Sequence, residues 1–207
     1  MVMLYYKSQK MQQFSLIEKQ ESLDVLNFHI RACERCNLSI TRKHALTGEG
    51  NIDAGIMFVA LSPGAKENSQ NRMFIGPSGQ VFNKLLHASG IDRKLVFMTN
   101  LVKCMLPKNR KPDADEIDTC SQFLFDEISI IQPEVIVPLG SYATKAILAK
   151  YHADPQSTEM SFSNINGKLL SINDENIFPL PHPAALLYNP SFEPDTIEKY
   201  RKLKTFL

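Results

Sequence analysis

The sequence predicts an α/β fold built around a mainly parallel sheet. Three short apolar runs alternate with segments of helical pattern, and polar or Pro-Gly loops follow the runs. Continuous apolar runs of about four to eight residues are typical of strands buried on both faces, as in a sheet covered by helices on each side. The length suits one compact domain. We therefore treat residues 1–207 as a single domain, with residues 1–30 as an N-terminal extension that we expect to be helical.

The first half of the chain is predicted to hold two helices and two strands. Apolar residues recur at near-helical spacing over residues 16–31, which predicts a helix. Residues 56–61 form a continuous apolar run that ends in a Ser-Pro-Gly loop, as a buried strand would. Residues 78–89 are expected to be helical. Residues 95–99 form a second buried run, which ends at Asn100.

The alternation continues in the second half. A proline followed by Asp113 and Glu116 has the spacing of a capping box, which predicts the start of a helix. Cys120 falls on the apolar face of that helix, so we expect its side chain to point inward. A third strand is predicted over residues 134–140, and a helix is predicted over residues 141–150.

The last predicted elements bring a histidine to the same edge of the sheet. Two strands are expected over residues 168–172 and 177–180, separated by an Asn-Asp-Glu-Asn turn, and a final helix over residues 194–206. In parallel α/β sheets, ligands bind beyond the carboxyl ends of the strands. Asn100 and His182 both fall at such ends, so this edge is the expected functional site.

The composition argues against export and against a membrane. No apolar run approaches the roughly 18–20 residues of a membrane span, and residues 1–20 lack the apolar core of a signal peptide. We therefore expect a cytoplasmic protein with reduced thiols. The net charge of +1 does not indicate a nucleic-acid partner. Basic clusters at residues 42–44, 108–111 and 201–204 would, taken alone, be solvated faces.

The chain has four cysteines, and their number matches one metal site. Cys33 and Cys36 form a C-x2-C pair, Cys104 follows the second strand, and Cys120 lies on a helix. Four thiolates are a complete ligand set for an iron–sulfur cluster or for zinc. In a reducing compartment, metal ligation is favoured over disulfides. The spacing alone leaves the metal open.

Six motifs together resemble one known family. The chain is similar to the family-4 uracil-DNA glycosylases, the iron–sulfur type, from about residue 33 to residue 190. The motifs occur in the expected order: Gly48-Glu49-Gly50-Asn51, Ala60-Leu61-Ser62-Pro63-Gly64, Phe74-Ile75-Gly76-Pro77-Ser78-Gly79, Thr99-Asn100-Leu101-Val102-Lys103-Cys104, Pro107-Lys108-Asn109-Arg110-Lys111-Pro112 and His182-Pro183-Ala184-Ala185-Leu186-Leu187.

The resemblance implies a fold, a cofactor and a reaction. The fold is a three-layer αβα sandwich with a central, mainly parallel sheet of four strands. The cofactor is a [4Fe-4S] cluster on the four cysteines, with zinc as the less favoured alternative. The reaction is monofunctional removal of uracil from DNA, which leaves an abasic site and needs no lyase step. The expected partner is uracil-containing DNA, bound by a monomer without a membrane, and a sliding-clamp partner is not readable from the sequence.

Three residues carry the expected base recognition and catalysis. A flipped base needs a stacking surface and a reader of its Watson–Crick edge. The aromatic ring of Phe74 suits stacking, and the amide of Asn100 matches the N3–H and O4 of uracil and mismatches cytosine. His182 is the expected catalytic donor, because a hydrogen bond to O2 would stabilise the charge that develops on departing uracil.

Other residues are expected to shape the pocket and bind DNA. The backbone around Leu61, Ser62 and Gly64 would form the pocket floor, and Leu186 or Leu187 would fill the gap left by the flipped base. Phosphate contacts, which position DNA without specifying sequence, are expected from Ser78, Lys103, Lys108 and Arg110.

The chain departs from the family at four positions. Leu61 stands where the family has a glutamate, and Asn68 stands where it has an aspartate. Met105 and Tyr188 replace residues that are usually arginine. These changes predict a slower enzyme with weaker DNA contacts. They also leave two alternatives open: an iron–sulfur DNA-binding protein with impaired catalysis, or a glycosylase acting mainly on other deaminated bases.

Overall fold

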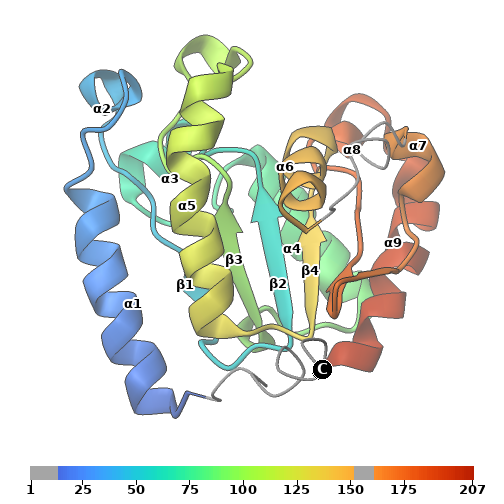
Figure 1. Ribbon diagram of the computed structural model, residues 1–207. Helices are drawn as coiled ribbons and strands as arrows, with labels where there is room; N and C mark the ends of the chain where they lie inside the picture. The colour runs from blue at the N-terminus through green and yellow to red at the C-terminus, as the bar shows by residue number, and fades with distance from the viewer. Residues whose placement is uncertain (1–13, 152–160) are drawn as a thin grey trace.

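A six-stranded mixed sheet forms the centre of the computed structural model, which describes residues 14–151 and 161–207 (Figure 1). The strand order is β1-β3-β2-β4-β6-β5. Strands β3, β2, β4 and β6 run parallel, and the short edge strands β1 and β5 are antiparallel to their neighbours. The strands are β1 (Glu49–Gly50), β2 (Ile56–Ala60), β3 (Val96–Asn100), β4 (Val135–Pro138), β5 (Leu170–Ile172) and β6 (Glu175–Ile177).

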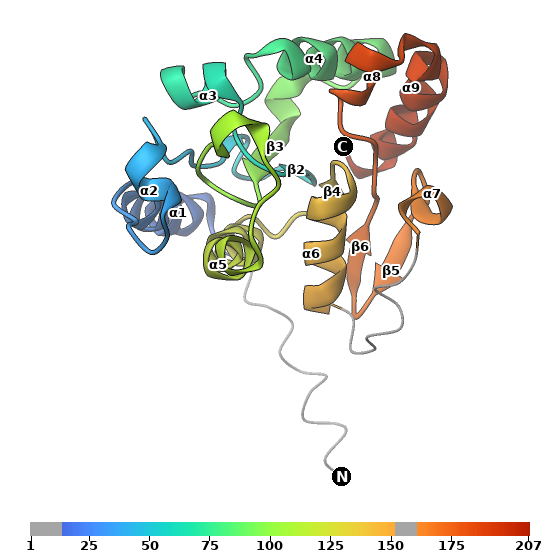
Figure 2. The ribbon, with the colours of Figure 1, turned by 90° about the horizontal axis from the view of Figure 1, so that it is seen from above.

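Helices cover both faces of this sheet, which confirms the predicted three-layer αβα fold. The expected number of four strands is corrected to six, because the short antiparallel strands β1 and β5 flank the four parallel ones. Seen from above, α1, α2, α5 and α6 lie on one side, and α3, α4, α8 and α9 lie on the other (Figure 2). None of the helices in the described ranges is long and apolar enough to cross a membrane. The helices are α1 (Leu16–Arg31), α2 (Leu38–Thr41), α3 (Ala65–Gln70), α4 (Pro77–Ser89), α5 (Ala114–Ile131), α6 (Ser141–Tyr151), α7 (Phe162–Ile165), α8 (Ala185–Tyr188) and α9 (Glu193–Arg201).

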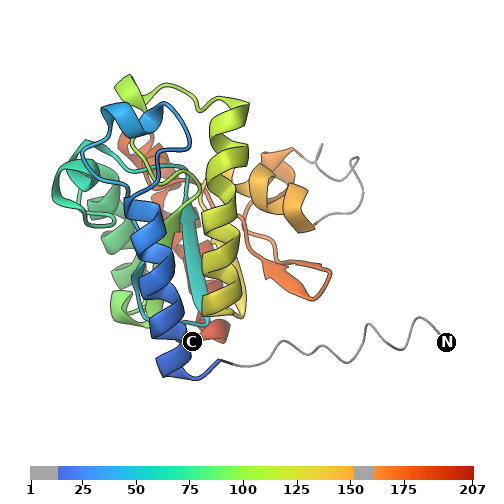
Figure 3. The same ribbon diagram turned by 60° about the vertical axis from the view of Figure 1, so that its left-hand side comes forward.

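The core has two halves because successive residues of β2 face opposite sides of the sheet. Met57 and Val59 belong to the apolar cluster under α1 and α5, which lie side by side in Figure 3. Phe58 points the other way, and its ring centroid lies 5.0 Å from that of Phe82 in α4 and 5.8 Å from that of Tyr200 in α9. Because β2 is buried on both faces, its residues do not alternate between apolar and polar. This agrees with the buried strand predicted from the continuous apolar run.

The predicted elements agree closely with the structure where the sequence signals were strong. Helix α1 spans the predicted range, and α5 begins with the predicted capping box of Asp113 and Glu116. Of the N-terminal extension expected over residues 1–30, residues 1–13 lie outside the described residues. The final helix is regular only as far as Arg201 and continues as a 3-10 turn over residues 202–206.

The late hairpin has a shorter turn than the predicted four residues. Asn173 and Asp174 alone form it, with φ angles of 49° and 70°, as a two-residue hairpin turn with both central residues left-handed requires. Glu175 therefore pairs with Ile172, and β6 begins two residues before the predicted start. The predicted end of this strand survives as a parallel bridge between Leu180 and Leu139.

Candidate active site

The carboxyl ends of β2 and β3 lie side by side at the upper edge of the sheet in Figure 1. Ala60 pairs with Asn100 in parallel register. The pairing continues past the strand ends, because the backbone N–H of Leu101 donates to the Ala60 carbonyl at 2.8 Å and that of Val102 donates to the Leu61 carbonyl at 2.9 Å. The loop after β2 is thereby fixed beside Asn100. The Leu61 side chain packs against the apolar cluster on the α5 side.

Phe74 is held in a restricted backbone conformation just before α4. Its φ angle is 52°, which is uncommon for a bulky residue and is typical of positions that the surrounding structure fixes. One face of its ring stacks on Phe82, with centroids 4.2 Å apart and planes 20° from parallel. A side chain at Gly79 would lie 2.1 Å from the Phe74 carbonyl group, so this glycine is what lets α4 start here. The result is a rigid aromatic residue.

Asn100 ends β3 with its side chain almost completely buried. Its Nδ2 donates to the sulfur of Met73 at 3.2 Å. A thioether is a weak acceptor, so a carbonyl oxygen offered by a ligand would be a better partner for this amide. Met73 also lines a pocket of about 390 Å³ beside β1. The buried amide therefore keeps hydrogen-bonding capacity that the protein itself uses only weakly.

His182 follows the Leu180 bridge and carries a defined pattern of ring hydrogen bonds. The backbone N–H of Ala184 donates to Nδ1 at 3.2 Å, so the neutral ring carries its proton on Nε2. Burial lowers the pKa of His182, while the negative charge of Glu67 acts in the opposite direction. The Cβ position at Gly140 lies 3.4 Å from the Cβ of His182, which brings the loop after β4 against the histidine. The site thus contains a neutral imidazole with one N–H to donate.

Glu67 is a site residue that the sequence did not reveal. It lies in α3, it is 8% exposed, and its Oε1 accepts the backbone N–H groups of Ile75 at 3.0 Å and Gly76 at 2.7 Å. A Cβ at Gly64 would lie 2.7 Å from Oε2. The carboxylate therefore joins the loop after β2, the loop before α4 and the surroundings of His182. In the sequence, the one feature that could have pointed to Glu67 is its position three residues after the Pro63-Gly64 pair.

Asn68, which stands where the family has an aspartate, still provides a hydrogen-bond acceptor. Oδ1 of the buried Asn68 accepts the backbone N–H groups of Lys43 at 2.9 Å and His44 at 3.1 Å. An amide oxygen performs this task as a carboxylate would, without the charge. Asn68 therefore ties α3 to the loop after α2.

The two adjacent leucines of the last motif face different surroundings. Leu186 is 7% exposed and belongs to the apolar cluster on the α4 side of the sheet, whereas Leu187 is 48% exposed. The prediction that Leu186 contacts DNA is therefore wrong, because its side chain packs in the core. Leu187, next to the exposed Tyr188 in α8, is left as the candidate to enter DNA.

Lys103 is not at the surface, which contradicts the phosphate contact expected of it. Its side chain is 2% exposed, and its Nζ lies 2.7 Å from both Thr99 Oγ1 and Glu127 Oε2. Thr99 donates to the same carboxylate oxygen at 2.6 Å. The lysine serves as the buried counterion of Glu127, so its charge is not available to DNA.

The other expected phosphate contacts differ in availability. Lys108 is exposed and has no ion-pair partner in the described part of the chain. Arg110 pairs with Glu116 at 2.5 Å and with Asp113 at 3.6 Å, so its charge is largely neutralised. Ser78 lies partly buried in the first turn of α4, where backbone N–H groups and the helix dipole favour an anion.

The four cysteines come from three separate segments and influence one another. Cys33 and Cys36 lie in the loop between α1 and α2, Cys104 follows β3, and Cys120 lies in α5. Burial raises the pKa of Cys104, and Cys36 and Cys33 raise it further; burial raises the pKa of Cys120 to about 11, with added contributions from Cys104 and Cys33. Electrostatic interactions thus link cysteines of all three segments. The cysteines form free thiols, with no disulfide among them.

Two of these sulfur atoms accept hydrogen bonds from N–H donors, which are the contacts that stabilise thiolates in a bound cofactor. The backbone N–H of Lys103 donates to Cys120 at 3.2 Å, and the Arg42 guanidinium donates to Cys104 at 3.5 Å. Within the described residues, no three Cys, His, Asp or Glu side chains are gathered tightly enough to form a single-ion metal site. Four free thiols with N–H···S contacts are the donor chemistry that a thiolate-bound cluster uses.

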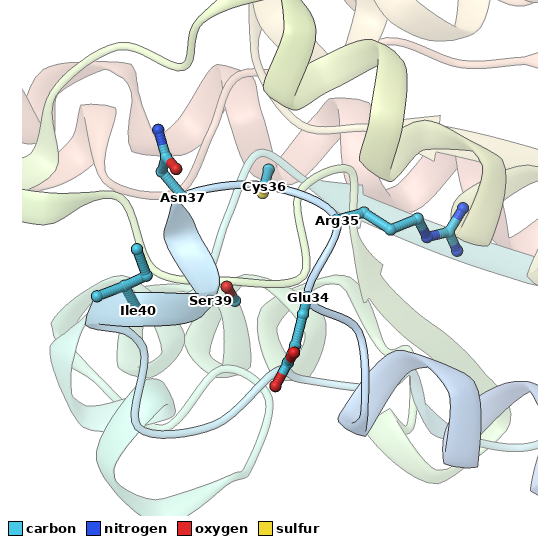
Figure 4. A pocket seen from close by; sticks show the side chains of 6 residues that line it. All are labelled: Glu34, Arg35, Cys36, Asn37, Ser39 and Ile40. Carbon is cyan, nitrogen blue, oxygen red and sulfur yellow. The ribbon is translucent and has the colours of Figure 1, made fainter.

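A pocket of about 490 Å³ opens at the cysteine loop (Figure 4). The Arg35 side chain extends from this loop toward α5, where its guanidinium lies 4.2 Å from the centroid of the Phe123 ring. This cation–π contact fixes the loop against the helix that carries Cys120. The pocket is lined by Glu34, Arg35, Cys36, Asn37, Ser39 and Ile40.

Comparisons with known proteins agree with this geometry. Residues 47–204 match the family model of the uracil DNA glycosylase superfamily. A type-4 uracil-DNA glycosylase of Saccharolobus solfataricus is 37% identical over 90% of this chain and 87% of its own length. One from Thermotoga maritima is 33% identical over 91% and 96%, and a type-5 uracil-DNA glycosylase of Pyrobaculum aerophilum is 32% identical over 68% and 66%. The chain therefore belongs to the uracil DNA glycosylase superfamily, and within it to the type-4 family.

Proposed function

We propose that this protein, acting as a cytoplasmic monomer, hydrolyses the N-glycosidic bond of deoxyuridine in DNA, the first step of base-excision repair. The observation that carries the proposal is the neutral imidazole of His182, which is hydrogen-bonded through Nδ1 at the edge of the sheet where β3 ends in Asn100. The relatives are named as uracil-DNA glycosylases and match most of the chain, which supports the same reaction.

Asn100 reads the base in this proposal. Its amide can donate to O4 of uracil and accept from N3–H, and cytosine offers the opposite pattern at both positions. The weak Met73 contact is the bond that uracil would replace. Because Asn100 is buried, a wrong base would leave its amide unpaired, which costs about 1–3 kcal/mol. Phe74 supplies the stacking surface, and its fixed backbone keeps the ring in place.

His182 stabilises the departing base. When the bond between C1′ and N1 breaks, its electron pair stays with uracil, and negative charge develops mainly at O2. The N–H at Nε2 donates a hydrogen bond to that oxygen, which is worth on the order of 10²–10³ in rate for one preorganised donor. Water adds to C1′ and releases one proton, which balances the uracil anion. The products are free uracil and an abasic site.

DNA contacts in this proposal use the residues that remain exposed. Leu187 enters the duplex in the space left by the flipped nucleotide. Lys108 contacts a phosphate, and the first turn of α4 at Ser78 offers backbone N–H groups to another. Arg110 contributes less, because Glu116 already neutralises it.

Cys33, Cys36, Cys104 and Cys120 hold a [4Fe-4S] cluster in this proposal. When bound, the cluster supplies four iron–thiolate bonds that cross-link the loop before α2, the loop after β3 and α5. A single zinc ion needs four sulfur atoms about 2.3 Å from one point. Membership of the type-4 family, for which the resemblance implies a cluster, supports the cluster over zinc. The four residues brace the loop that begins immediately after Asn100.

The test is base release from oligonucleotides carrying one uracil opposite guanine, opposite adenine or in a single strand. Wild-type protein should release free uracil and leave alkali-labile sites in at least one of these substrates. His182→Ala should slow single-turnover release about 10²–10³-fold, whereas His87→Ala, at an exposed position of α4, should not. Binding of uracil DNA without base release would overturn the proposal in favour of a non-catalytic binding protein. Release of hypoxanthine or xanthine alone would overturn the choice of uracil.

A further inference from the structure

Glu67 is a carboxylate whose two oxygen atoms have different surroundings. Oε1 accepts two backbone N–H groups, from Ile75 and Gly76. Oε2 has no hydrogen-bond partner among the described residues and lies against Gly64, where any Cβ would be 2.7 Å away. One oxygen therefore fixes the side chain, and the other remains available at the loop that follows β2.

The charge of this carboxylate reaches the catalytic histidine. Glu67 acts on the protonation of His182 across the site, against the larger effect of burial. A Cβ at Gly76 would lie 3.0 Å from both oxygen atoms of Glu67. Glycine on both sides of the carboxylate thus leaves room for a charged group between the loop after β2 and the loop that carries Phe74.

Resting on the proposed function, we propose that Glu67 supplies the fixed negative charge of the active site, the role that Leu61 cannot fill. As the glycosidic bond breaks, positive charge develops on the deoxyribose. A carboxylate that is already held in place stabilises this positive charge and does not have to reorient during the reaction. Leu61 is apolar and half-buried against the core, so it offers neither charge nor hydrogen bond.

The same contacts allow a structural role to be separated from the charge. Glu67→Gln keeps an oxygen that can accept from Ile75 and Gly76 but removes the charge. Glu67→Ala removes both. Glu49→Gln is the matched control, because Glu49 also anchors this segment, accepting the Met73 N–H at 2.9 Å and pairing with Arg72.

The experiment is single-turnover uracil release by these variants, together with their affinity for uracil DNA. Glu67→Gln should slow release about 10–100-fold, the effect of one partly screened charge near the reaction centre, with affinity and thermal unfolding close to wild type. Because the carboxylate favours the imidazolium form of His182, its loss should also move the acidic limb of the rate profile to lower pH. Glu49→Gln should leave the rate within about twofold of the wild type, because the carboxylate that acts on His182 is Glu67 and the Glu49 charge is paired with Arg72.

A second carboxylate provides a rescue test. Leu61→Glu added to Glu67→Gln should recover at least part of the lost rate, which a purely structural role of Glu67 would not permit. A Glu67→Gln variant as fast as wild type, or one slowed only as much as Glu49→Gln, would overturn the role of Glu67 while leaving the proposed function intact. Absence of uracil release by wild-type protein would overturn both.

Discussion

Nζ of Lys103 lies 2.7 Å from Oε2 of Glu127, and the two side chains are 2% and 0% exposed. Thr99 shares the same carboxylate oxygen, and the other oxygen accepts the backbone N–H of Gly48 at 3.1 Å. This buried network joins β3 and the loop after it to α5. It adds to the contact between the Lys103 N–H and Cys120 in holding the loop after Asn100 against α5.

Lys103→Met should destabilise the protein by about 3–5 kcal/mol, because it leaves the buried Glu127 carboxylate without a counterion. Urea unfolding measures the loss. The double variant Lys103→Met/Glu127→Leu should recover most of it, since no uncompensated charge remains. A single variant as stable as wild type would contradict the network. Lys108→Met is the surface control: its stability should not change, but its DNA affinity should depend less steeply on salt.

The two leucines of α8 should separate stability from activity. Leu186→Ala should cost about 2–5 kcal/mol, as truncation of a buried leucine does. Leu187→Ala should leave the free energy of unfolding nearly unchanged but reduce uracil release from duplex DNA more than from a single strand, because only a duplex leaves a gap to fill. Unfolding curves and single-turnover rates on the two substrates check this. A Leu187→Ala variant with equal losses on both would argue against the wedge.

Cys120→Ser should reduce the stability of the protein before it changes the choice of base. The side chain is buried in α5 and, with the cluster bound, would be one of its four attachments. Wild-type protein should contain iron and sulfide and show visible absorbance that dithionite bleaches; the variant should lose both colour and resistance to urea. One zinc per chain in colourless wild-type protein would contradict the cluster, as would a cluster-free variant of full stability.

The pH dependence of His182 has a defined sign. Burial lowers its pKa, so the folded protein holds fewer protons than the unfolded chain below the ordinary histidine value of about 6.5. The contribution of His182 to the free energy of unfolding is therefore largest at pH values above the ordinary histidine pKa. It declines as the pH falls toward the lowered pKa of the folded protein. Activity should decline over the same lower range, because protonation of Nδ1 breaks the hydrogen bond from Ala184. NMR titration of His182 measures whether its pKa lies below the ordinary histidine value.

Elements with strong local signals could be predicted from the sequence. The spacing of apolar residues defined α1, and the capping pair of Asp113 and Glu116 defined the start of α5. The strand ends were equally clear, so Asn100 could be assigned to the functional edge before the structure was known. Short elements such as β1 and α3 were missed, because two or six residues are too few to show a period.

The roles of individual side chains depended on distant partners. Lys103 sits in a motif rich in polar residues, and only Glu127, 24 residues later, explains why it is buried. Leu186 and Leu187 are adjacent residues of the same type. Which of them is exposed depends on how the short helix α8 packs against the core. The importance of Glu67 becomes clear only in the folded structure, where the loop before α4 donates two backbone N–H groups to its carboxylate. Such pairings follow from tertiary packing and leave no mark in local composition.

The parallel pairing of β4 with β6 bears on how firmly His182 is held. Five residue pairs join β2 to β3, whereas a single pair, Ile136 with Ile177, joins β4 to β6. Backbone hydrogen bonds continue beyond that pair, because the N–H groups of Phe178 and Leu180 donate to the carbonyls of Ile136 and Pro138, both at 2.9 Å. The chain is thus tied to β4 until two residues before His182. The histidine and Asn100 therefore extend from one continuous hydrogen-bonded sheet, which fixes the spacing between the group that reads the base and the group that stabilises its departure.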